Sequence, residues 1–392
     1  MNPRHYTTLM LALVAIGMAL AGLAVFIVNP YYVLHDRELD GFNRMKPALD
    51  RHAVVYKGYL IERIQPNILI LGNSRSQVGF DSRHPAFTGK AVANAALTGA
   101  NLTEALRFYR HAVAVARPEL VIIGIDPSAF VSTAERQQLD EAGIGLVKPA
   151  WSQAWQHLKM HLNWEALLDA WRTIAWQSRP EKFHYGPEEF GNSSIPYMTQ
   201  TIIGDGGSGR ASRSQLRKIK EPLDTTPLYQ AARANLALLE QTALDACRRG
   251  IHMKLVVPPL HILMVEKWHR EQGGEMLAWW FKSLQKTVDS VDRQCDGPQP
   301  ELWSAYSYNP ITAEALPPPS AGVALMRNYW EISHFKRELG DKVLNVVMGL
   351  ADAETSDIPV TRLDNGKLDA YLAELEAGRA LYLAQIQQAL KP

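Results

Sequence analysis

An uncharged apolar stretch near the N-terminus decides where the rest of the chain can lie. Residues 7–28, TTLMLALVAIGMALAGLAVFIV, contain no charged side chain. As a helix this stretch would be about 33 Å long, enough to cross the roughly 30 Å hydrocarbon core of a bilayer. No second apolar run of this length follows. The sequence therefore predicts one membrane span.

The charges that flank the span predict its orientation. Arg4 and His5 precede the run, and the charges that follow it are balanced. The positive-inside rule then places residues 1–6 in the cytoplasm and the chain after Pro30 in a periplasm-like space. The predicted location is the inner membrane, with a single span and a periplasmic soluble domain. A cleaved signal peptide is the alternative, because residues 19–24 offer small-residue cleavage sites. The apolar run continues through residues 25–28, which favours an uncleaved anchor.

Composition excludes some classes of protein. The chain has 392 residues, of which 47% are hydrophobic, so it can build a substantial core. Its net charge of +1 argues against a nucleic-acid binder, which needs a concentrated basic face. No C-x-x-C motif is present, so no structural metal site is expected. Cys247 and Cys295 could pair in an oxidising compartment, or they could be two free, buried thiols.

The order of apolar runs predicts an α/β fold. Residues 67–72 (NILILG) form a continuous apolar run, which is typical of a strand that is buried on both faces of a parallel sheet. Further strands are expected at 90–97, 119–126 and 252–258. Helices are expected at 102–116, 228–250, 335–350 and 367–390. This alternation predicts a doubly wound parallel sheet.

The predicted domain organisation has six parts. They are a cytoplasmic N-terminus (1–6), a transmembrane anchor (7–28), a polar stalk (29–65), a catalytic domain (66–350), a helical insertion within it (135–225) and a C-terminal helical tail (351–392) that docks on the domain. Residues 151–176 carry five tryptophans at helical spacing, which favours packing over a lid. Residues 204–215 (GDGGSGRASRSQ) are predicted to be a flexible basic loop.

Polar residues follow the predicted strands, where sites in open α/β sheets lie. Ser74 follows the first strand, Asn94 and Gly99 follow the second, and Asp126 ends the third. His261 follows the fourth strand after two prolines, and it is either a pocket-wall residue or a loop histidine. Glu331 and His334 precede the helix at 335–350.

These blocks resemble those of the SGNH/GDSL hydrolase superfamily. The Gly-Asp-Ser block corresponds to Gly72-Asn73-Ser74, and the Asn with a Gly five residues later to Asn94 and Gly99. The Gly-x-Asn block corresponds to Gly124-Ile125-Asp126, and the Asp-x-x-His block to the residues from Glu331 to His334. The anchor and the GNSR stretch resemble a membrane-anchored branch akin to periplasmic enzymes that move or remove acetyl groups on exopolysaccharides.

The resemblance implies a three-layer, flavodoxin-like α/β fold and acyl transfer without a cofactor. Ser74 would be the nucleophile, His334 the base that activates it, and Glu331 the carboxylate that orients His334. Backbone N–H groups of Ser74 and Gly99 would form the oxyanion hole. Side chains expected in the pocket are those of Asn73, Arg75, Asn94 and His261.

Asp126 departs from the pattern, because the family has an oxyanion-donating Asn there. An ionised carboxylate about 4 Å from the oxyanion would cost roughly 4 kcal/mol at an effective dielectric of 20. Asp126 could instead be protonated, point away as a cap or pair with a cation. The neighbouring Arg75 predicts an Arg75–Asp126 ion pair.

Three functions follow from these observations. The first is a serine acyl esterase or O-acetyltransferase acting on an envelope or secreted polysaccharide; a transferase would take its acyl group from a membrane partner protein. The second is a catalytically inactive relative that binds polysaccharide or helps to assemble an export machine. The third, a nucleotide-binding protein, has little support, because GNSRSQVG is neither G-x-G-x-x-G nor a Walker loop.

Overall fold

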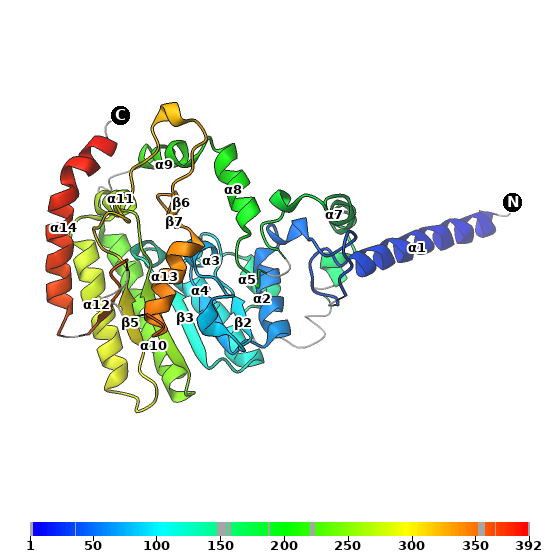
Figure 1. Cartoon of the computed structure of the whole chain (residues 1–392). Coiled ribbons are helices and arrows are strands. Elements are labelled where there is room, and N and C mark those ends of the chain that lie inside the picture. Colours follow the sequence, from blue (N-terminus) through cyan, green and yellow to red (C-terminus); the bar gives the residue numbers. More distant parts are fainter. Residues whose placement is uncertain are drawn as a thin grey trace.

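A six-stranded sheet forms the centre of the molecule in the computed structural model (Figure 1). The structure describes residues 3–35, 37–146, 155, 158–186, 189–219, 224–351, 357–364 and 366–390. The strand order is β2-β1-β3-β4-β5-β8, with β1 to β5 parallel and β8 antiparallel to β5. The strands are β1 (Ile68–Leu71), β2 (Val92–Asn94), β3 (Leu120–Gly124), β4 (His252–Val257), β5 (Glu301–Ser304) and β8 (Thr361–Leu363). The prediction of an α/β fold with a parallel sheet is confirmed.

Helices cover both faces of this sheet, which gives three layers. Side chains alternate across the strands, so Leu69 and Val121 enter one core while Ile70 and Ile122 enter the other. The first core is shared with α2 (Ala53–Ile64), α4 (Leu102–Val115), α10 (Thr226–Arg248), α11 (Ile262–Gln272), α12 (Met276–Asp292) and α14 (Leu368–Ala389). The second core contains residues of α13 (Arg337–Val347) and Phe80, which follows α3 (Ser74–Gly79).

Residues 53–64 belong to a helix of the folded domain and not to the predicted stalk. They form α2, and its residues Val54, Leu60 and Ile61 are buried in the first core. Lys57 is also fully buried, where it donates a hydrogen bond to the carbonyl of Asn94 at 2.7 Å. This helix is therefore part of the folded domain, and the stalk interpretation of residues 29–65 is wrong for it.

The insertion is helical in its described part, as predicted. It contains α5 (Gln138–Ala142), α7 (Trp164–Ala175), α8 (Ile195–Gly204) and α9 (Ser208–Leu216). Trp151 lies outside the described residues. The predicted flexible loop at 204–215 is wrong, because residues 208–216 are the helix α9. Its glycines allow close packing instead: a Cβ on Gly207 would lie 2.7 Å from the carbonyl carbon of Val323.

Short elements complete the fold. Two strands, β6 (Tyr329–Glu331) and β7 (His334–Phe335), form a separate antiparallel pair. Proline occupies the first position of five 3₁₀ turns, where its fixed φ suits a helix start; these are η1 (Pro47–Leu49), η2 (Pro85–Phe87), η3 (Pro127–Ala129), η4 (Pro180–Lys182) and η5 (Pro319–Ala321). A disulfide joins Cys247 of α10 to Cys295, which follows α12.

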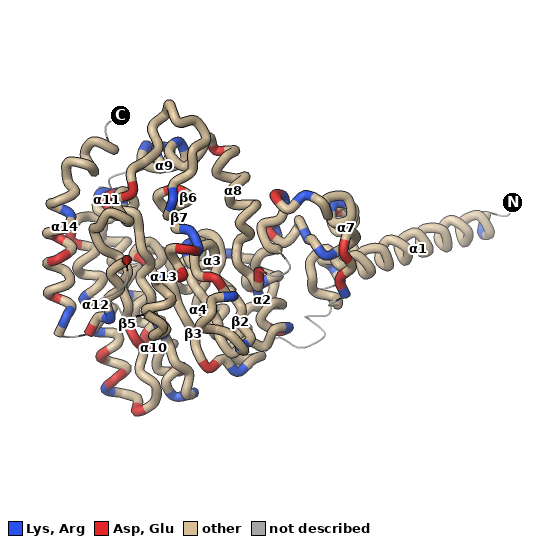
Figure 2. The backbone as a smooth tube through the Cα atoms, in the orientation of Figure 1, with Lys and Arg blue, Asp and Glu red and all other residues tan. Residues whose placement is uncertain are grey.

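The N-terminal helix α1 (Pro3–Val28) projects away from the body (Figure 1). Figure 2 shows that it carries no charged residue beyond its N-terminal end. It is long and apolar enough to cross a membrane, as an anchor or as a signal sequence. Its last turn is packed, because Val25 and Val28 are buried together with Ala166 and Ala170 of α7.

Candidate active site

Ser74 stands at the carboxyl end of β1, as the first residue of α3. Asn73 caps this helix, because its Oδ1 accepts a hydrogen bond from the backbone N–H of Arg75 at 3.0 Å. The turn requires glycine: Gly72 has a φ of +132°, and a Cβ there would lie 2.6 Å from the carbonyl oxygen of Gly124. The turn leaves Ser74 partly exposed to solvent, between buried neighbours.

A hairpin brings the predicted base to this serine. His334 Nε2 lies 2.8 Å from Ser74 Oγ, within hydrogen-bonding distance. On the other side of the ring, His334 Nδ1 is hydrogen-bonded to Glu331 Oε1. The side chain of His334 is 24% exposed and that of Glu331 is 5% exposed, so solvent reaches the base but hardly reaches the carboxylate. The three residues have the order and contacts of a serine triad with glutamate as its acid.

Glu331 is held in its charged form. Burial raises its pKa, but the charge and the hydrogen bond of His334 lower it, and so do two further hydrogen bonds; the net pKa lies below the ordinary value. Those two bonds come from the backbone N–H of Ser333, at 2.7 Å, and from Gln215 Nε2. Gln215 Oε1 in turn accepts a hydrogen bond from Ser333 Oγ at 2.5 Å.

The helix α9 supports the hairpin and was missed in the sequence. Besides Gln215, it contributes Ser212 Oγ, which accepts a hydrogen bond from the backbone N–H of Ile332 at 3.2 Å. Ser208 Oγ accepts one from the backbone N–H of Met326 at 3.0 Å. The signal was the S-x-x-x-S-x-x-Q spacing, which places these three side chains along one side of a helix.

Asp126 is not available to an oxyanion. Its Oδ2 accepts hydrogen bonds from Asn73 Nδ2 at 2.6 Å and from Arg75 Nη1 at 3.0 Å. Its Oδ1 accepts one from the backbone N–H of Ser128 at 3.0 Å, so Asp126 also caps the turn η3. The predicted Arg75–Asp126 ion pair is present and almost fully buried. Asp126 therefore does not take the oxyanion role that its position has in the family, because both carboxylate oxygens already accept hydrogen bonds.

Arg75 also packs on an aromatic ring. Its guanidinium lies 5.1 Å from the ring centre of Trp268 in α11. Asn73, Arg75 and Asp126 thus form one buried, hydrogen-bonded polar group at the ends of β1 and β3, with Asn73 and Arg75 on either side of Ser74 in the chain.

Two predicted pocket residues have structural roles instead. Asn94 is fully buried, and its Nδ2 donates to the carbonyls of Ser76 at 3.0 Å and Phe80 at 3.1 Å, which anchors the end of α3 to β2. His261 is fully buried at the start of α11, where its Nε2 is hydrogen-bonded to the carbonyl of Glu314 at 2.8 Å. Burial lowers the pKa of His261 to about 4. The prediction that these two side chains line the pocket is wrong, because their polar atoms are engaged inside the fold.

Gly99 occupies an exposed turn after β2, with a φ of +70°. The neighbouring Thr98 Oγ1 donates to Gln77 Oε1 of α3 at 3.4 Å, so this turn lies beside the helix that begins with Ser74. Among the described residues, no hydrogen bond joins Gly99 to Ser74 or His334. Its oxyanion role stays a prediction.

A second serine, histidine and aspartate also come together, which sequence reasoning missed. Ser193 Oγ lies 2.8 Å from His184 Nε2, and His184 Nδ1 lies 2.7 Å from Asp50 Oδ1. Ser193 is only 1% exposed, and its hydroxyl also accepts a hydrogen bond from Gln77 Nε2 at 2.9 Å. Ser193 also lines a cavity beside Val78 and Trp330, but its hydroxyl is already engaged by His184 and Gln77, and the group ties the insertion to α3.

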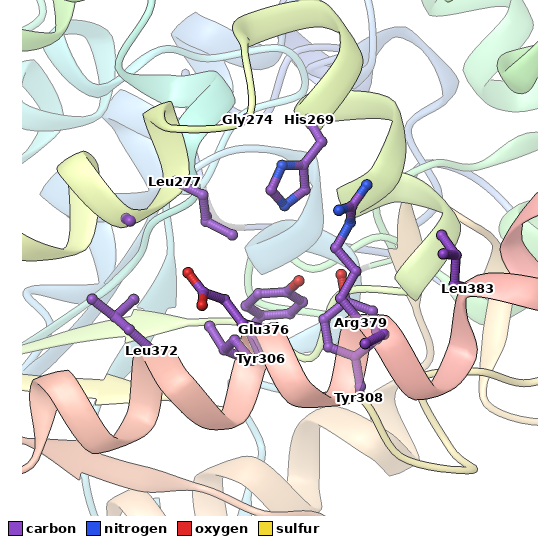
Figure 3. Close-up of a pocket in the computed structure, with 12 residues that line it drawn as sticks. His269, Gly274, Leu277, Tyr306, Tyr308, Leu372, Glu376, Arg379 and Leu383 are labelled. Carbon is purple, nitrogen blue, oxygen red and sulfur yellow. The ribbon is translucent and has the colours of Figure 1, made fainter.

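Two cavities differ in their relation to the triad. One of about 230 Å³ is lined by Val78, one turn after Ser74 on α3, and by Trp330 and Lys336, which flank the hairpin residues Glu331 and His334. The other, of about 360 Å³, lies between α11, α12 and α14 (Figure 3). Neither lining includes a triad residue, but only the first of these two cavities is lined by residues that are close to the triad in the chain.

One group of side chains has the composition of a metal site. Ligand atoms of His52, Glu165 and Asp169 lie within 4.8 Å of one another. Asp169 already forms ion pairs with Arg51 and, at 3.0 Å, with Arg172. A metal ion would have to compete with two guanidinium groups, so this arrangement is better described as a structural ion-pair network.

No family model matches the chain, and neither a similar curated protein nor a similar solved structure was found. The assignment of function therefore depends on the geometry of the site itself.

Proposed function

We propose that this protein is a membrane-anchored serine acyl esterase or O-acetyltransferase of the SGNH type. It would act through an acyl-enzyme on an envelope or secreted polysaccharide in the periplasm. The observation that carries the proposal is the 2.8 Å distance between His334 Nε2 and Ser74 Oγ, with Glu331 on the other ring nitrogen.

The arrangement of the sheet supports this fold assignment. The five parallel strands have the order 2-1-3-4-5 of flavodoxin-like folds. Ser74, Gly99 and Asp126 all follow the carboxyl ends of strands, where the ligands of open α/β sheets bind. Glu331 and His334 reach the same edge from the β6–β7 hairpin.

The first half-reaction forms the acyl-enzyme. Ser74 Oγ attacks the ester carbonyl carbon while its proton passes to His334 Nε2. Glu331 accepts the Nδ1–H of the ring and stabilises the imidazolium. When the tetrahedral intermediate collapses, the bond to the leaving alcohol breaks, and His334 returns the proton to that alcohol.

The second half-reaction releases the acyl group. A water molecule or a sugar hydroxyl attacks the acyl carbonyl and gives its proton to His334 Nε2. The bond to Ser74 Oγ then breaks, and the serine recovers the proton. Water makes the protein an esterase, whereas a sugar hydroxyl makes it a transferase that needs an acyl-donor protein in the membrane.

The negative charge that develops on the carbonyl oxygen in these steps needs hydrogen-bond donors to stabilise it. The backbone N–H groups of Ser74 and Gly99 would provide it, each worth about 2.7–4 kcal/mol. The Arg75–Asp126 pair is compatible with this arrangement, because the guanidinium compensates the carboxylate charge that would otherwise repel the oxyanion.

Trapping the intermediate tests the proposal. The full-length protein, in detergent, is mixed with p-nitrophenyl acetate, quenched with acid and digested. We expect the peptide that contains Ser74 to gain the mass of one acetyl group, and we expect no such gain in Ser74→Ala. Acetylation that is absent, or that persists in this variant, would contradict the proposal.

Asp126 favours a second candidate, a catalytically inactive polysaccharide-binding or assembly component. In this case the loss of the family's asparagine would have removed the oxyanion donor. The partial exposure of Ser74 and its hydrogen bond to His334 favour an active enzyme, because a site that has lost its activity has no need to keep this geometry. Polysaccharide binding without any acyl-enzyme would support the second candidate.

A further inference from the structure

The helix α7 and the residues before it present large apolar side chains that remain mostly exposed in the described structure. The opposite side of α7 is buried through Ala166 and Ala170, against the end of α1. On the outer side, the side chains of Trp164 and Trp171 are 72% and 64% exposed. Leu168, which is half-buried, lies between them, so the three residues form one stripe at i, i+4 and i+7. The prediction that the tryptophans of this segment serve packing is wrong for these two.

Apolar exposure continues before the helix. Leu158 and Leu162 are 46% and 55% exposed, and Trp155 is 53% exposed. Leu162 precedes α7, and we call it together with Trp164, Leu168 and Trp171 the apolar face of α7. Soluble surfaces rarely gather so many large apolar side chains, and such a patch usually marks an interaction site.

The position of this face relative to α1 identifies its partner. A Cβ on Gly22 of α1 would lie 3.0 Å from Leu162 Cδ2, so the two residues are in contact. Gly22 precedes the end of α1 at Val28 by six residues, or about 9 Å along the helix axis. If α1 spans a bilayer, Leu162 lies at a depth that belongs to the membrane.

The composition of the segment suits the membrane–water boundary. Tryptophan is enriched at this boundary, because its ring is apolar while its indole N–H seeks a polar partner. The exposed Lys159 lies close to the face in the chain, and its long stem can extend toward the headgroups. An amphipathic helix of this kind lies in the plane of the interface.

We propose that α7 is a second membrane contact, which lies in the headgroup region of the leaflet where α1 ends. Trp164 and Trp171 point toward the acyl chains. The inference rests on α1 being retained as an anchor, and it is independent of the acyl-transfer chemistry. A single helix would leave the domain free to rotate about its axis, whereas two contacts fix the orientation of the domain relative to the bilayer.

Fluorescence quenching in vesicles tests this contact. Both native cysteines are bonded to each other, so one added cysteine can be labelled selectively with an environment-sensitive dye. The full-length protein is reconstituted into phosphatidylcholine–phosphatidylglycerol vesicles with a nitroxide near the headgroup or near the chain end. Labels are placed by Trp164→Cys and Trp171→Cys. Ile16→Cys, in the middle of α1, and Leu381→Cys, on the distant and 79% exposed surface of α14, are the controls (Figure 1).

We expect the labels at 164 and 171 to be quenched by the shallow nitroxide several times more strongly than the label at 381. The label at 16 should respond most to the deep nitroxide. If the label at 16 is quenched while the labels at 164 and 171 behave like the label at 381, α1 spans the bilayer but the proposed contact of α7 is refuted. A protein partner would then have to cover the apolar face. If 16 is not quenched, the premise that α1 spans the bilayer fails and the proposal falls with it.

Discussion

His334 Nε2 lies 2.8 Å from Ser74 Oγ, although 260 positions separate the two residues in the chain. The parallel sheet supplies one of them at the end of β1, and the β6–β7 hairpin supplies the other. Ser193 and His184 stand at the same 2.8 Å in a buried setting. The two pairs have the same distance between Nε2 and Oγ, but Ser74 is partly exposed and Ser193 is almost fully buried, which makes them matched probes of function.

Replacing either member of the exposed pair should abolish acyl transfer. We expect Ser74→Ala and His334→Ala to lower kcat for p-nitrophenyl acetate by about 10⁴-fold or more, the range for loss of a nucleophile or its base. Ser193→Ala should keep the activity and instead lose roughly 1 kcal/mol of unfolding free energy, because it removes buried hydrogen bonds. Kinetics and urea denaturation of the three variants check this. The assignment fails if Ser193→Ala is the inactive variant.

Those parts of the fold with strong local patterns could be predicted from the sequence. The continuous apolar runs of β1 and β3 exist because both faces of these strands are buried, and β4 is apolar and buried in its last three residues. β5 was missed because it is four residues long and only half-buried on one face. Ser74, Glu331 and His334 could be found because each stands in a short motif near a recognisable element.

Long-range contacts hid the remaining parts of the site. Gln215 lies 116 positions from Glu331 in the chain. The glycines before Gln215 suggest a loop when the sequence is considered alone, because the segment against which they pack is distant in the chain. Asn94 and His261 have the residue types of a site, but their partners are buried backbone carbonyls. The exposure of Trp164 depends on where α1 meets α7, which periodicity within α7 cannot reveal.

Glu331 should matter for the rate far more than for the fold. Glu331→Gln keeps the size of the side chain, but it removes the charge that stabilises protonated His334. We expect kcat to fall by about 10⁴-fold, as with the equivalent change in serine triads. Glu374→Gln, on the exposed side of α14, is the matched control and should leave kcat unchanged. Similar rates for both variants would remove Glu331 from the triad.

Gln215 acts as a positioning residue through Glu331. In Gln215→Glu, a second carboxylate faces Glu331, and the repulsion between like charges raises the pKa of Glu331. Activity should then require a higher pH, so we expect the acidic limb of the rate–pH profile to move upward. In Gln215→Leu, kcat should fall about tenfold with little change in KM. A role limited to stability would lower the amount of folded enzyme and leave the shape of the pH profile unchanged.

The buried Arg75–Asp126 pair predicts a non-additive response to mutation. Arg75→Ala leaves the Asp126 carboxylate buried without its cation, and we expect a loss of about 3–5 kcal/mol of unfolding free energy together with the activity. Adding Asp126→Asn removes the uncompensated charge and should restore part of that stability. Urea denaturation of both single variants and the double variant gives the coupling. Additive losses, or an Arg75→Ala protein with unchanged stability and activity, would mean that the pair does not shape the site.

His261 should make the fold sensitive to acid. Its Nδ1 accepts a hydrogen bond from the backbone N–H of Leu263, so the buried ring cannot take up a second proton without breaking the helix cap. Burial lowers its pKa in the folded protein to about 4, from 6.5 in the unfolded chain. The unfolded chain therefore binds more protons between these values. The stabilisation is complete above pH 6.5 and declines as the pH falls toward 4, by about 3 kcal/mol in total.

His261→Asn keeps a side chain that can cap the helix but does not titrate. Urea denaturation at pH 7.5 and 4.5 should show a difference between wild type and variant that shrinks at the lower pH; a difference that is equal at both would show that His261 takes no part in the acid response.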